Sequence, residues 1–396
     1  MTSSDENPII CNCLKIKIGY LLSHTESARR VRASVRLLLN RNESVDALRK
    51  KIDQIDGKIV RLLNDRASVA LKIGQAKSLS NDLVYAPHRE PEVLRRVIDL
   101  SRGPLPDQAI GAIYREVISA TRALESELKI AYLGPEATYT HLAAREQFGS
   151  APEFIAAKTV GEVFQEVEQG RASFGVAPIE NSTEGVVAHT LDQLVESNVS
   201  ICAEIFLDIH HCLLSRSGRG EDIRRVVSHP QALAQCRRWL EGHFPNAPGE
   251  EVASTAQAAA RAAADPTLAA ISSRLAKEVY KLEMVAENIE DHSNNITRFL
   301  VIGRKQPRPS KKDKTSLVFS VKDEPGILHR MLQPLAKSRI NLTKIESRPL
   351  KDKPWEYMFF IDFKGNKDEA RVKRAIGSLE KNCLFMKVLG SYPIGV

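Results

Sequence analysis

The sequence lacks the features that mark membrane proteins and disulfide-rich secreted proteins. Among its 396 residues no stretch approaches about 18 consecutive apolar side chains, so we predict no transmembrane helix and no membrane partner. Its six cysteines form no framework, and the only close pair, Cys11 and Cys13, has no second pair to complete a metal site. We therefore expect reduced thiols, no metal and a cytoplasmic location.

Common catalytic signatures are also missing. The sequence contains no GxGxxG dinucleotide fingerprint, no P-loop, no HExxH zinc motif and no GxSxG nucleophile elbow. Nucleotide, zinc and serine-hydrolase chemistry are therefore poor explanations of its function.

The sequence has no broad basic region, although its formal net charge is +8. Residues 1–44 carry seven Lys and Arg against four Asp and Glu, and residues 304–314 carry six against one, which together account for the whole excess. The remainder is neutral, so we predict no nucleic-acid partner. A few placed cations can still bind an anionic metabolite.

The N-terminal part of the chain predicts an extension followed by helices. Residues 1–44 are an unassigned extension, and its acidic residues argue against a transit peptide. Residues 45–128 predict an all-α unit with three helices: Val45 to about Lys77, Arg89–Ser101 and Pro106–Glu127.

The rest of the chain predicts two further domains. Residues 129–303 alternate strands and helices, with helices expected over Thr183–Glu196 and Gln231–Glu241. This alternation indicates an α/β domain with mostly parallel strands and two lobes around a cleft. Residues 304–314 read as a linker, because they contain two prolines, like charges and no apolar side chain. Residues 315–396 follow a βαββαβ pattern, which is typical of a ferredoxin-like α+β domain.

The first predicted helix carries an apolar seam with a heptad spacing. Its members are Val45, Leu48, Ile52, Ile55, Ile59, Leu62, Val69, Ile73 and Ala76. The helix is too long for two shorter helices to cover, so the seam predicts a second copy of the chain. Arg66 lies where the seam requires an apolar residue, which predicts either a bound anion or a buried Arg–Glu pair.

The spacing of the cations on this helix limits which of them can share a ligand. Arg66 and Lys77 are eleven residues apart, which places them on one face and roughly 16 Å apart along the axis. Arg49 and Arg66 are seventeen residues apart, or roughly 25 Å. If Arg49 and Arg66 bind one small metabolite, they must therefore come from different chains.

Three motifs in this helical part resemble the all-helical chorismate mutases, which are intertwined dimers. The motifs are LRKKIDQIDGKIVRLLNDR at residues 48–66, KIGQAK at 72–77 and HRE at 88–90. The resemblance implies a chorismate site made of Arg49 from the partner chain together with Arg66, Lys77, Arg89, Glu90, Thr121 and Glu125. Ala86 stands where some members carry Asp, and Glu125 stands where many carry Gln.

The Claisen rearrangement of chorismate suits such a site. The reaction needs a dianion held in a compact conformer and a donor to the ether oxygen, where charge grows. Lys77 and Glu125 are the implied catalytic donors. Glu125 can donate only when it is protonated, so we expect burial to favour its neutral form and mutase activity to improve toward acidic pH.

Four motifs in the α/β part have the order and spacing of prephenate dehydratases. They are GPEATYTH at residues 134–141, VAPIENSTEGVV at 176–187, SHPQALAQC at 228–236 and NNITRF at 294–299. Taken singly, Ser182, Thr183 and Ser228 could each be a helix N-cap. The resemblance implies a two-lobed fold of the periplasmic-binding-protein type with Thr297 as the catalytic acid. The implied prephenate-binding residues are Glu180, Asn181, Ser182, Ser228, Gln235 and Arg298.

The C-terminal part resembles the phenylalanine-sensing ACT domain of the same enzymes. The resemblance rests on DEPGILH at residues 323–329, IESRP at 345–349 and WEYMFFID at 355–362. It implies an effector site made of Gly326, Ile327, Leu328, Glu346, Ser347, Arg348 and Pro349. The alternative is that Glu346 and Arg348 are an ordinary pair on a surface strand. Ile327 replaces the alanine that is usual in the family.

Together the resemblances imply a bifunctional chorismate mutase–prephenate dehydratase of phenylalanine biosynthesis. Chorismate would become prephenate and then phenylpyruvate, without a cofactor, in a homodimer or larger homo-oligomer inhibited by phenylalanine. Two alternatives remain open. One is a dehydratase with a silent mutase domain that acts on prephenate or arogenate, and the other is a non-catalytic amino-acid sensor.

Overall fold

The computed structural model describes residues 44–79, 87, 89–350 and 353–395. Residues 1–43 of the predicted N-terminal extension and Ala86 therefore lie outside the described residues. The chain divides into two compact units, residues 1–70 with 92–117 and residues 71–91 with 118–396. Each unit is described by itself below.

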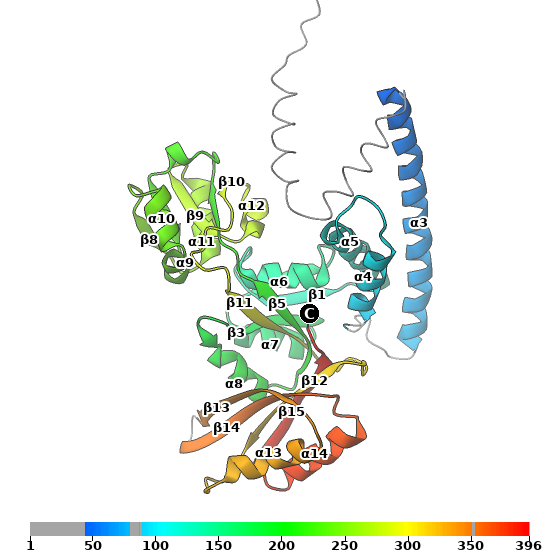
Figure 1. Cartoon of the computed structure of the whole chain (residues 1–396), viewed down its shortest axis with the longest axis vertical. Helices are drawn as coiled ribbons and strands as arrows, with labels where there is room; N and C mark the ends of the chain where they lie inside the picture. Colours follow the sequence, from blue (N-terminus) through cyan, green and yellow to red (C-terminus); the bar gives the residue numbers. More distant parts are fainter. Residues whose placement is uncertain (1–43, 80–86, 88, 351–352, 396) are drawn as a thin grey trace, which may run out of the picture. The chain divides into compact units, whose positions relative to one another are not determined.

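The three predicted helices are confirmed as α3 (Val45–Leu79), α4 (Arg89–Leu100) and α5 (Asp107–Glu125). Helix α3 is continuous over 35 residues and is the long blue helix of Figure 1. Its apolar seam is open to solvent in the single chain: Leu48, Ile52, Ile55 and Ile59 are between 43% and 56% exposed. A continuous helix keeps the heptad stripe on one side, so the seam is a single exposed apolar face.

The first lobe of the α/β part is a mixed sheet between two layers. Its strands run in the order β2-β1-β3-β11-β5, with β4 paired to β3. Figure 1 shows α6 on one side of these strands and α7 on the other. The elements are β1 (Lys129–Leu133), α6 (Tyr139–Phe148), β2 (Glu153–Ala157), α7 (Val160–Glu168), β3 (Phe174–Asn181), β4 (Gly185–Val186), α8 (Ala188–Glu196), β5 (Ser200–Asp208) and β11 (Ile296–Gly303).

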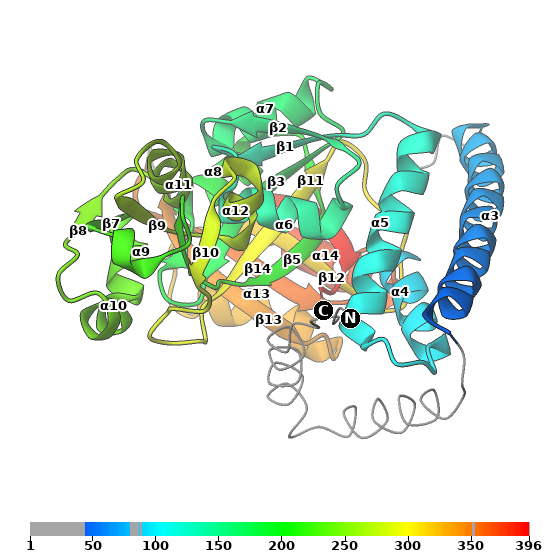
Figure 2. The ribbon, with the colours of Figure 1, turned by 90° about the horizontal axis from the view of Figure 1, so that it is seen from above.

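The second lobe is a smaller sheet with the strand order β10-β6-β9-β7-β8. Its elements gather at the left in Figure 2, coloured green to yellow. They are β6 (Cys212–Ser215), η1 (Gly220–Asp222), β7 (Arg225–Ser228), α9 (Pro230–Gln235), α10 (Arg237–His243), β8 (Gly249–Glu251), α11 (Thr255–Ala264), β9 (Leu268–Ser272), α12 (Arg274–Tyr280) and β10 (Glu283–Ala286).

The predicted two-lobed α/β architecture is confirmed, but the prediction of mostly parallel strands was wrong. The chain crosses between the lobes twice, from β5 to β6 and from β10 to β11. Strand β11 therefore returns to the first lobe antiparallel to both β3 and β5, and β6 is antiparallel to β9 and β10. Each lobe is consequently a mixed sheet.

Two predicted helices also differ. The helix expected from Thr183 begins only at Ala188, because the Asn181 side chain accepts hydrogen bonds from the backbone of Thr183 and Glu184 and holds them in a turn. Neither Ser182 nor Thr183 is the N-cap of α8. The helix expected over 231–241 is two helices, α9 and α10, separated at Cys236.

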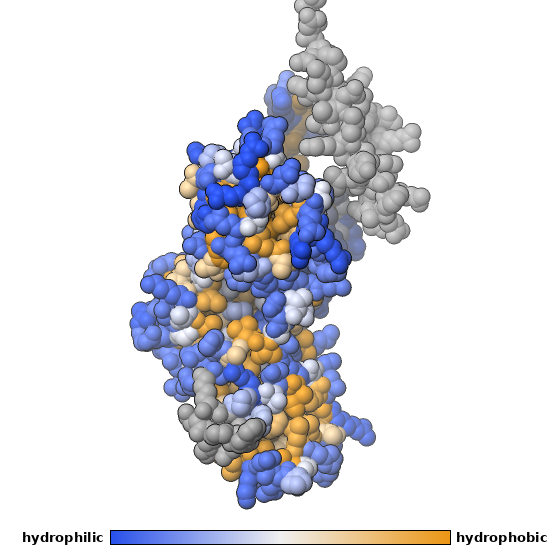
Figure 3. Space-filling view, turned by 90° about the vertical axis from the view of Figure 1, so that its left-hand side faces the viewer, coloured by the Kyte–Doolittle hydropathy of each residue, from blue (hydrophilic) through white to orange (hydrophobic). Residues whose placement is uncertain are grey.

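The C-terminal part has the predicted ferredoxin-like fold. Its strands pair in the order β13-β14-β12-β15. Strand β12 begins at Asp313, inside the predicted linker 304–314, so Asp313 and Lys314 belong to the sheet rather than to the linker. The elements are β12 (Asp313–Ser320), α13 (Ile327–Lys337), β13 (Leu342–Leu350), β14 (Lys353–Lys364), α14 (Ala370–Glu380) and β15 (Phe385–Pro393). Figure 3 shows apolar surface over the lower part of the molecule, where this domain lies.

Candidate functional site

The strands β3 and β11 carry the residues of two predicted motifs directly opposite each other. Thr297 pairs with Asn181, and Arg298 pairs with Glu180. Because successive side chains of a strand point to opposite faces, these two cross-strand pairs lie on opposite faces of the sheet. The fold therefore separates residues that the motifs place side by side.

Asn181 and Thr297 form a direct hydrogen bond. The Asn181 Nδ2 atom donates to Thr297 Oγ1 at 2.8 Å. Its Oδ1 atom accepts from the backbone N–H groups of Thr183 at 2.9 Å and Glu184 at 3.0 Å. Backbone N–H groups can only donate, so they fix the orientation of the amide. The hydroxyl of Thr297 is thus the acceptor in this bond, and its own proton is available to a ligand.

The same amide begins a chain of hydrogen bonds between the lobes. Asn181 Nδ2 also donates to Asn295 Oδ1 at 2.7 Å, and Asn295 Nδ2 donates to Gln235 Oε1 at 3.1 Å. Gln235 Oε1 lies 2.8 Å from His211 Nε2, and His211 Nδ1 lies 2.7 Å from the Tyr139 hydroxyl. Asn295 and His211 flank the two crossings of the chain, so this network connects Thr297 with both lobes.

His211 takes one defined tautomer in this network. Its ring is buried, and burial lowers its pKa below the usual value although the hydrogen bond that it donates to Gln235 opposes the shift. The neutral ring carries its proton on Nε2, because Gln235 Oε1 can only accept. Nδ1 then carries no proton, and the Tyr139 hydroxyl shares its single proton between His211 Nδ1 and the His210 carbonyl oxygen, which lies 2.9 Å away.

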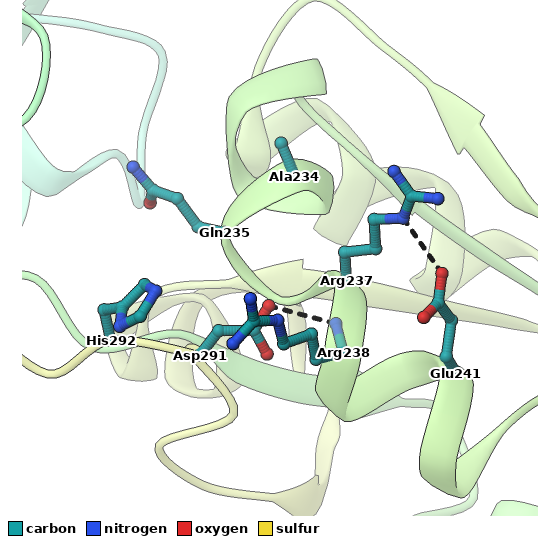
Figure 4. A pocket seen from close by; sticks show the side chains of 7 residues that line it. All are labelled: Ala234, Gln235, Arg237, Arg238, Glu241, Asp291 and His292. Carbon is teal, nitrogen blue, oxygen red and sulfur yellow. Dashed lines mark hydrogen bonds and ion pairs between the residues drawn. The ribbon is translucent and has the colours of Figure 1, made fainter.

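Gln235 also borders a cavity of about 450 Å³ in the second lobe, shown in Figure 4. Figure 4 shows the Gln235 side chain pointing away from the ion pair that Arg237 forms with Glu241 at 2.9 Å. The lining residues are Ala234, Gln235, Arg237, Arg238, Glu241, Asp291 and His292. Gln235 is thus the member of the predicted prephenate set that belongs both to this cavity and to the Thr297 network.

The two predicted serines have other contacts. Ser182 Oγ donates to Asn294 O and accepts from the N–H of Ile296, so it fastens the start of β11. Ser228 is fully buried, and its hydroxyl donates to Ile271 O at 2.7 Å. The structure does not bring Ser228 to the Thr297 network, and the N-cap of α9 is His229, so the expectation of an N-cap at Ser228 was wrong.

Glu180 and Arg298 lie away from Thr297 and face the C-terminal domain. Arg298 contacts Glu204 of β5 and Asp362 of β14, each at 2.8 Å, and Glu180 contacts Lys344 of β13 at 2.5 Å. We expected both to face a substrate. The alternation along β3 and β11 instead turns them to the opposite face, where the guanidinium and the carboxylate have partners within the chain.

In the helical part, the second compact unit includes the end of α3, the start of α4 and the end of α5. Arg122 Nη1 forms an ion pair with Glu90 at 2.7 Å, and its Nη2 donates to Phe148 O at 2.8 Å. A Cβ atom added at Gly74 would lie 2.9 Å from Cγ of Glu125, so α3 and α5 approach closely here. Glu90 and Glu125 therefore lie at helix contacts, and Thr121 is buried.

The remaining chorismate candidates are on the helices. Arg49 is exposed and lies 3.5 Å from Asp46, whereas Arg66 is half-buried. Because α3 is one unbroken helix, the separation of roughly 25 Å between Arg49 and Arg66 holds in the structure. Lys77 belongs to α3, but its side chain lies outside the described part, and Arg89 is the first residue of α4.

Comparison with known proteins identifies the family. The chain matches the chorismate mutase type II family over residues 48–126, the prephenate dehydratase family over residues 130–307 and the ACT domain family over residues 315–381. A bifunctional chorismate mutase/prephenate dehydratase of Aquifex aeolicus (strain VF5) is 48% identical over 355 residues, which cover 89% of this chain and 98% of that one.

The chain belongs to the bifunctional chorismate mutase/prephenate dehydratase family. Its three domains follow the order expected from the sequence, with a mutase domain, a dehydratase domain and an ACT domain. The motif resemblances are thereby confirmed.

Solved structures resemble the dehydratase and ACT domains together. A prephenate dehydratase from Arthrobacter aurescens in complex with L-Phe is 34% identical with a TM-score of 0.62, covering 67% of this chain and 90% of that one. A protein described as a quorum-quenching acylase, GqqA, is 30% identical with the same TM-score and covers 67% of this chain and 98% of that one. The fold alone therefore does not decide the reaction, and the site residues must.

The predicted effector residues of the ACT domain lie on two elements. Gly326 has φ +73° and precedes α13, where Ile327 and Leu328 pack against the core of the domain. On β13 the side chains alternate: Glu346 and Arg348 are half-buried, whereas Ser347 and Pro349 are exposed. Arg348 lies 3.2 Å from Asp192 of α8, so it contacts the dehydratase domain and is no ordinary surface residue.

Sequence reasoning missed Asn295, His211 and Tyr139 as parts of the site. Asn295 and Tyr139 lie inside quoted motifs, whereas His211 follows a strand and has no motif of its own. Their role depends on contacts between residues far apart in the sequence, such as Asn295 with Asn181, which are 114 positions apart. The periodicity of a sequence carries no information about such contacts.

Three further observations concern the cysteines, possible metal ligands and membrane-spanning helices of the described residues. Cys202, Cys212, Cys236 and Cys383 are free thiols. Within the described ranges, no group of three or more metal-ligating side chains could hold a metal ion. No helix of the described part has the length and apolar character that crossing a bilayer requires.

Proposed function

We propose that residues 129–303 carry the dehydratase site around Thr297, and that residues 45–128 carry the mutase site. Family membership supports both reactions. The observation that carries the dehydratase assignment is the polarity of the Asn181–Thr297 bond, in which Thr297 accepts and keeps its own proton for a ligand.

In the dehydratase reaction, Thr297 acts as the general acid. Its hydroxyl proton passes to the leaving hydroxyl of prephenate, the C–O bond breaks and water departs. The ring carboxylate leaves as CO₂ at the same time, and its C–C electrons complete the aromatic ring of phenylpyruvate. Asn181 holds the threonine oxygen through a fixed amide, so the acid is positioned before substrate binds. The hydrogen bond between Asn295 and Gln235 links the second lobe to the network around Thr297.

In the mutase reaction, the enzyme needs only to hold chorismate and to stabilise charge on the ether oxygen. Arg66 and Arg89 are the proposed carboxylate ligands, with Arg49 supplied by a second copy of the chain. Lys77 and Glu125 are the proposed donors to the ether oxygen. The support for a homodimer is the exposed seam of α3, because four adjacent seam residues are each more than 40% exposed.

Phenylalanine is the proposed effector of the ACT domain. The support is the dehydratase from Arthrobacter aurescens, which was solved with L-Phe. The proposed contacts are the start of α13, Gly326–Leu328, and the β13 segment Glu346–Pro349. A cytoplasmic location stays a prediction from the sequence.

The proposal is tested by giving purified protein chorismate and following phenylpyruvate, with and without phenylalanine. We expect phenylpyruvate to form and phenylalanine to suppress its formation. If phenylpyruvate forms from added prephenate but not from chorismate, the mutase domain is silent. If arogenate is turned over faster than prephenate, arogenate is the preferred substrate. Failure with all three substrates, together with phenylalanine binding, would leave the amino-acid sensor.

A further inference from the structure

The face of the β3–β11 pair opposite Thr297 carries a cluster of alternating charges, here called the ACT-facing cluster, in which every charged side chain except the partly exposed Glu180 is largely buried. Three cations meet three carboxylates in it, so their charges balance. Its charged members are Arg298, Lys314 and Lys344 together with Glu180, Glu204 and Asp362, and the Tyr392 hydroxyl completes it.

Arg298 is the centre of this cluster. Its Nε lies 2.8 Å from Glu204 Oε2, and its Nη2 lies 2.8 Å from Asp362 Oδ2 and 3.0 Å from the Tyr392 hydroxyl. Burial opposes its charge, but Tyr392, Asp362 and Glu204 raise its pKa above the usual value, so it stays protonated. Asp362 and Tyr392 belong to the ACT domain, and the next residue before Arg298 is the proposed acid.

Glu180 provides a second connection of the same kind. Its carboxylate lies 2.5 Å from Lys344 Nζ of β13 and 4.0 Å from Arg298 Nη1. The next residue, Asn181, holds Thr297. Lys344 shares the half-buried side of β13 with Glu346 and Arg348, which are two of the proposed effector residues. One ACT strand thus contacts the dehydratase domain directly beneath the Asn181–Thr297 pair.

The two sheets are also in backbone contact. A Cβ atom added at Gly390 of β15 would lie 2.3 Å from Ile201 O of β5, so only glycine allows β15 to approach this strand. Val318, Phe360 and Leu389 of the ACT sheet share one apolar core with residues of the dehydratase lobe. The ACT-facing cluster therefore lies at a tight boundary, where Arg298, Glu204 and Asp362 are almost fully buried and the loss of a charged partner is strongly disfavoured.

We propose that Arg298 and Glu180 are positioning residues through which the ACT sheet sets the Asn181–Thr297 pair. This inference rests on the proposed role of Thr297 in the dehydratase reaction. Arg298 and Glu180 neighbour Thr297 and Asn181 on their strands, so a shift of the ACT sheet moves all four. An effector bound along β13 then reaches the acid through Lys344 without entering the cleft.

The test compares lysines that cross the same domain boundary. Lys344→Met removes the charge beside Glu180 but keeps the aliphatic stem. Lys387→Met is the matched control, because Lys387 contacts the carbonyl oxygens of Leu194, Val195 and Ser197 and no residue of β3 or β11. Asp362→Asn is a second test variant that keeps the shape of the side chain and removes one charge facing Arg298.

For Lys344→Met and Asp362→Asn we expect a loss of dehydratase kcat of about tenfold, with KM within about twofold. Inhibition by phenylalanine should weaken, and mutase activity in the same chain should not change. Lys387→Met should keep wild-type kcat and inhibition. Unchanged kcat and inhibition in both test variants, or equal losses in Lys387→Met, would overturn the proposal. If Asp362→Asn does not fold, Lys344→Met decides alone.

A second readout does not depend on activity. Hydrogen–deuterium exchange of the peptide that covers β11 should be faster in Lys344→Met than in wild type and in Lys387→Met. Unchanged exchange contradicts the positioning role, even if the reaction proves to differ from the proposed one. The opposite result is also informative. If exchange of β11 is faster in Lys344→Met but Thr297→Val stays active, the role of Thr297 is refuted while the coupling between the ACT sheet and β11 stands.

Discussion

The replacement Thr297→Val tests the proposed acid with little change of shape. Valine keeps the branched side chain and removes only the hydroxyl. Asn181 Nδ2 then loses its 2.8 Å acceptor but retains Asn295 Oδ1 at 2.7 Å, so one donor proton of a half-buried amide loses its protein partner. We expect this to lower the free energy of unfolding by about 1–3 kcal/mol.

The catalytic loss should be larger. Losing a positioned general acid lowers the rate by about 10²- to 10⁴-fold, which corresponds to about 3–5 kcal/mol of transition-state stabilisation. The assay is phenylpyruvate formation from prephenate, with chorismate rearrangement in the same preparation as the control for folding. Thr297→Ser keeps the hydroxyl and should stay within about tenfold of wild type.

Two outcomes would refute this reasoning. Dehydration by Thr297→Val within about threefold of wild type would show that the hydroxyl donates no proton in the rate-determining step. Equal losses in Thr297→Val and Thr297→Ser would show that shape rather than the proton matters. Loss of mutase activity as well would indicate that the variant is misfolded.

Three further predictions concern other parts of the chain. Ile55→Glu places a charge in the exposed α3 seam, so it should yield monomers in analytical ultracentrifugation. Mutase activity should fall at least tenfold, while dehydratase activity persists. A monomer with full mutase activity would contradict a site shared between two chains. Gly74→Ala adds a methyl group 2.9 Å from Cγ of Glu125, so it should displace the Glu125 side chain. Mutase kcat should fall several-fold, and dehydratase kcat should not change. An unchanged mutase kcat would argue against Glu125 as a donor. Burial, with help from Arg145, lowers the pKa of His141 from 6.5 to about 4. The unfolded chain therefore binds a proton on this side chain at a higher pH than the folded chain does. The free energy of unfolding should be highest above pH 6.5 and about 3 kcal/mol lower at pH 4. Urea unfolding of wild type and of His141→Asn measures this difference, and the same pH dependence in both proteins would disprove the assignment.

Much of the fold follows from local patterns. The heptad spacing of α3 was sufficient to predict one long helix, because a helix forms from contacts three and four residues apart. The βαββαβ order of the ACT domain was likewise readable from strand and helix periods. Helix α8 was misplaced by five residues, because the side chain of Asn181 competes for the backbone donors that would have started it.

The sequence by itself determined the family and the order of the domains, because these are written in contiguous motifs. Only the tertiary structure decided which motif residues act together. Adjacent residues of a strand point to opposite faces, so Thr297 faces the cleft network and Arg298 the ACT domain. The partners of both come from strands and loops far along the chain, and their meeting is a property of packing rather than of any local pattern.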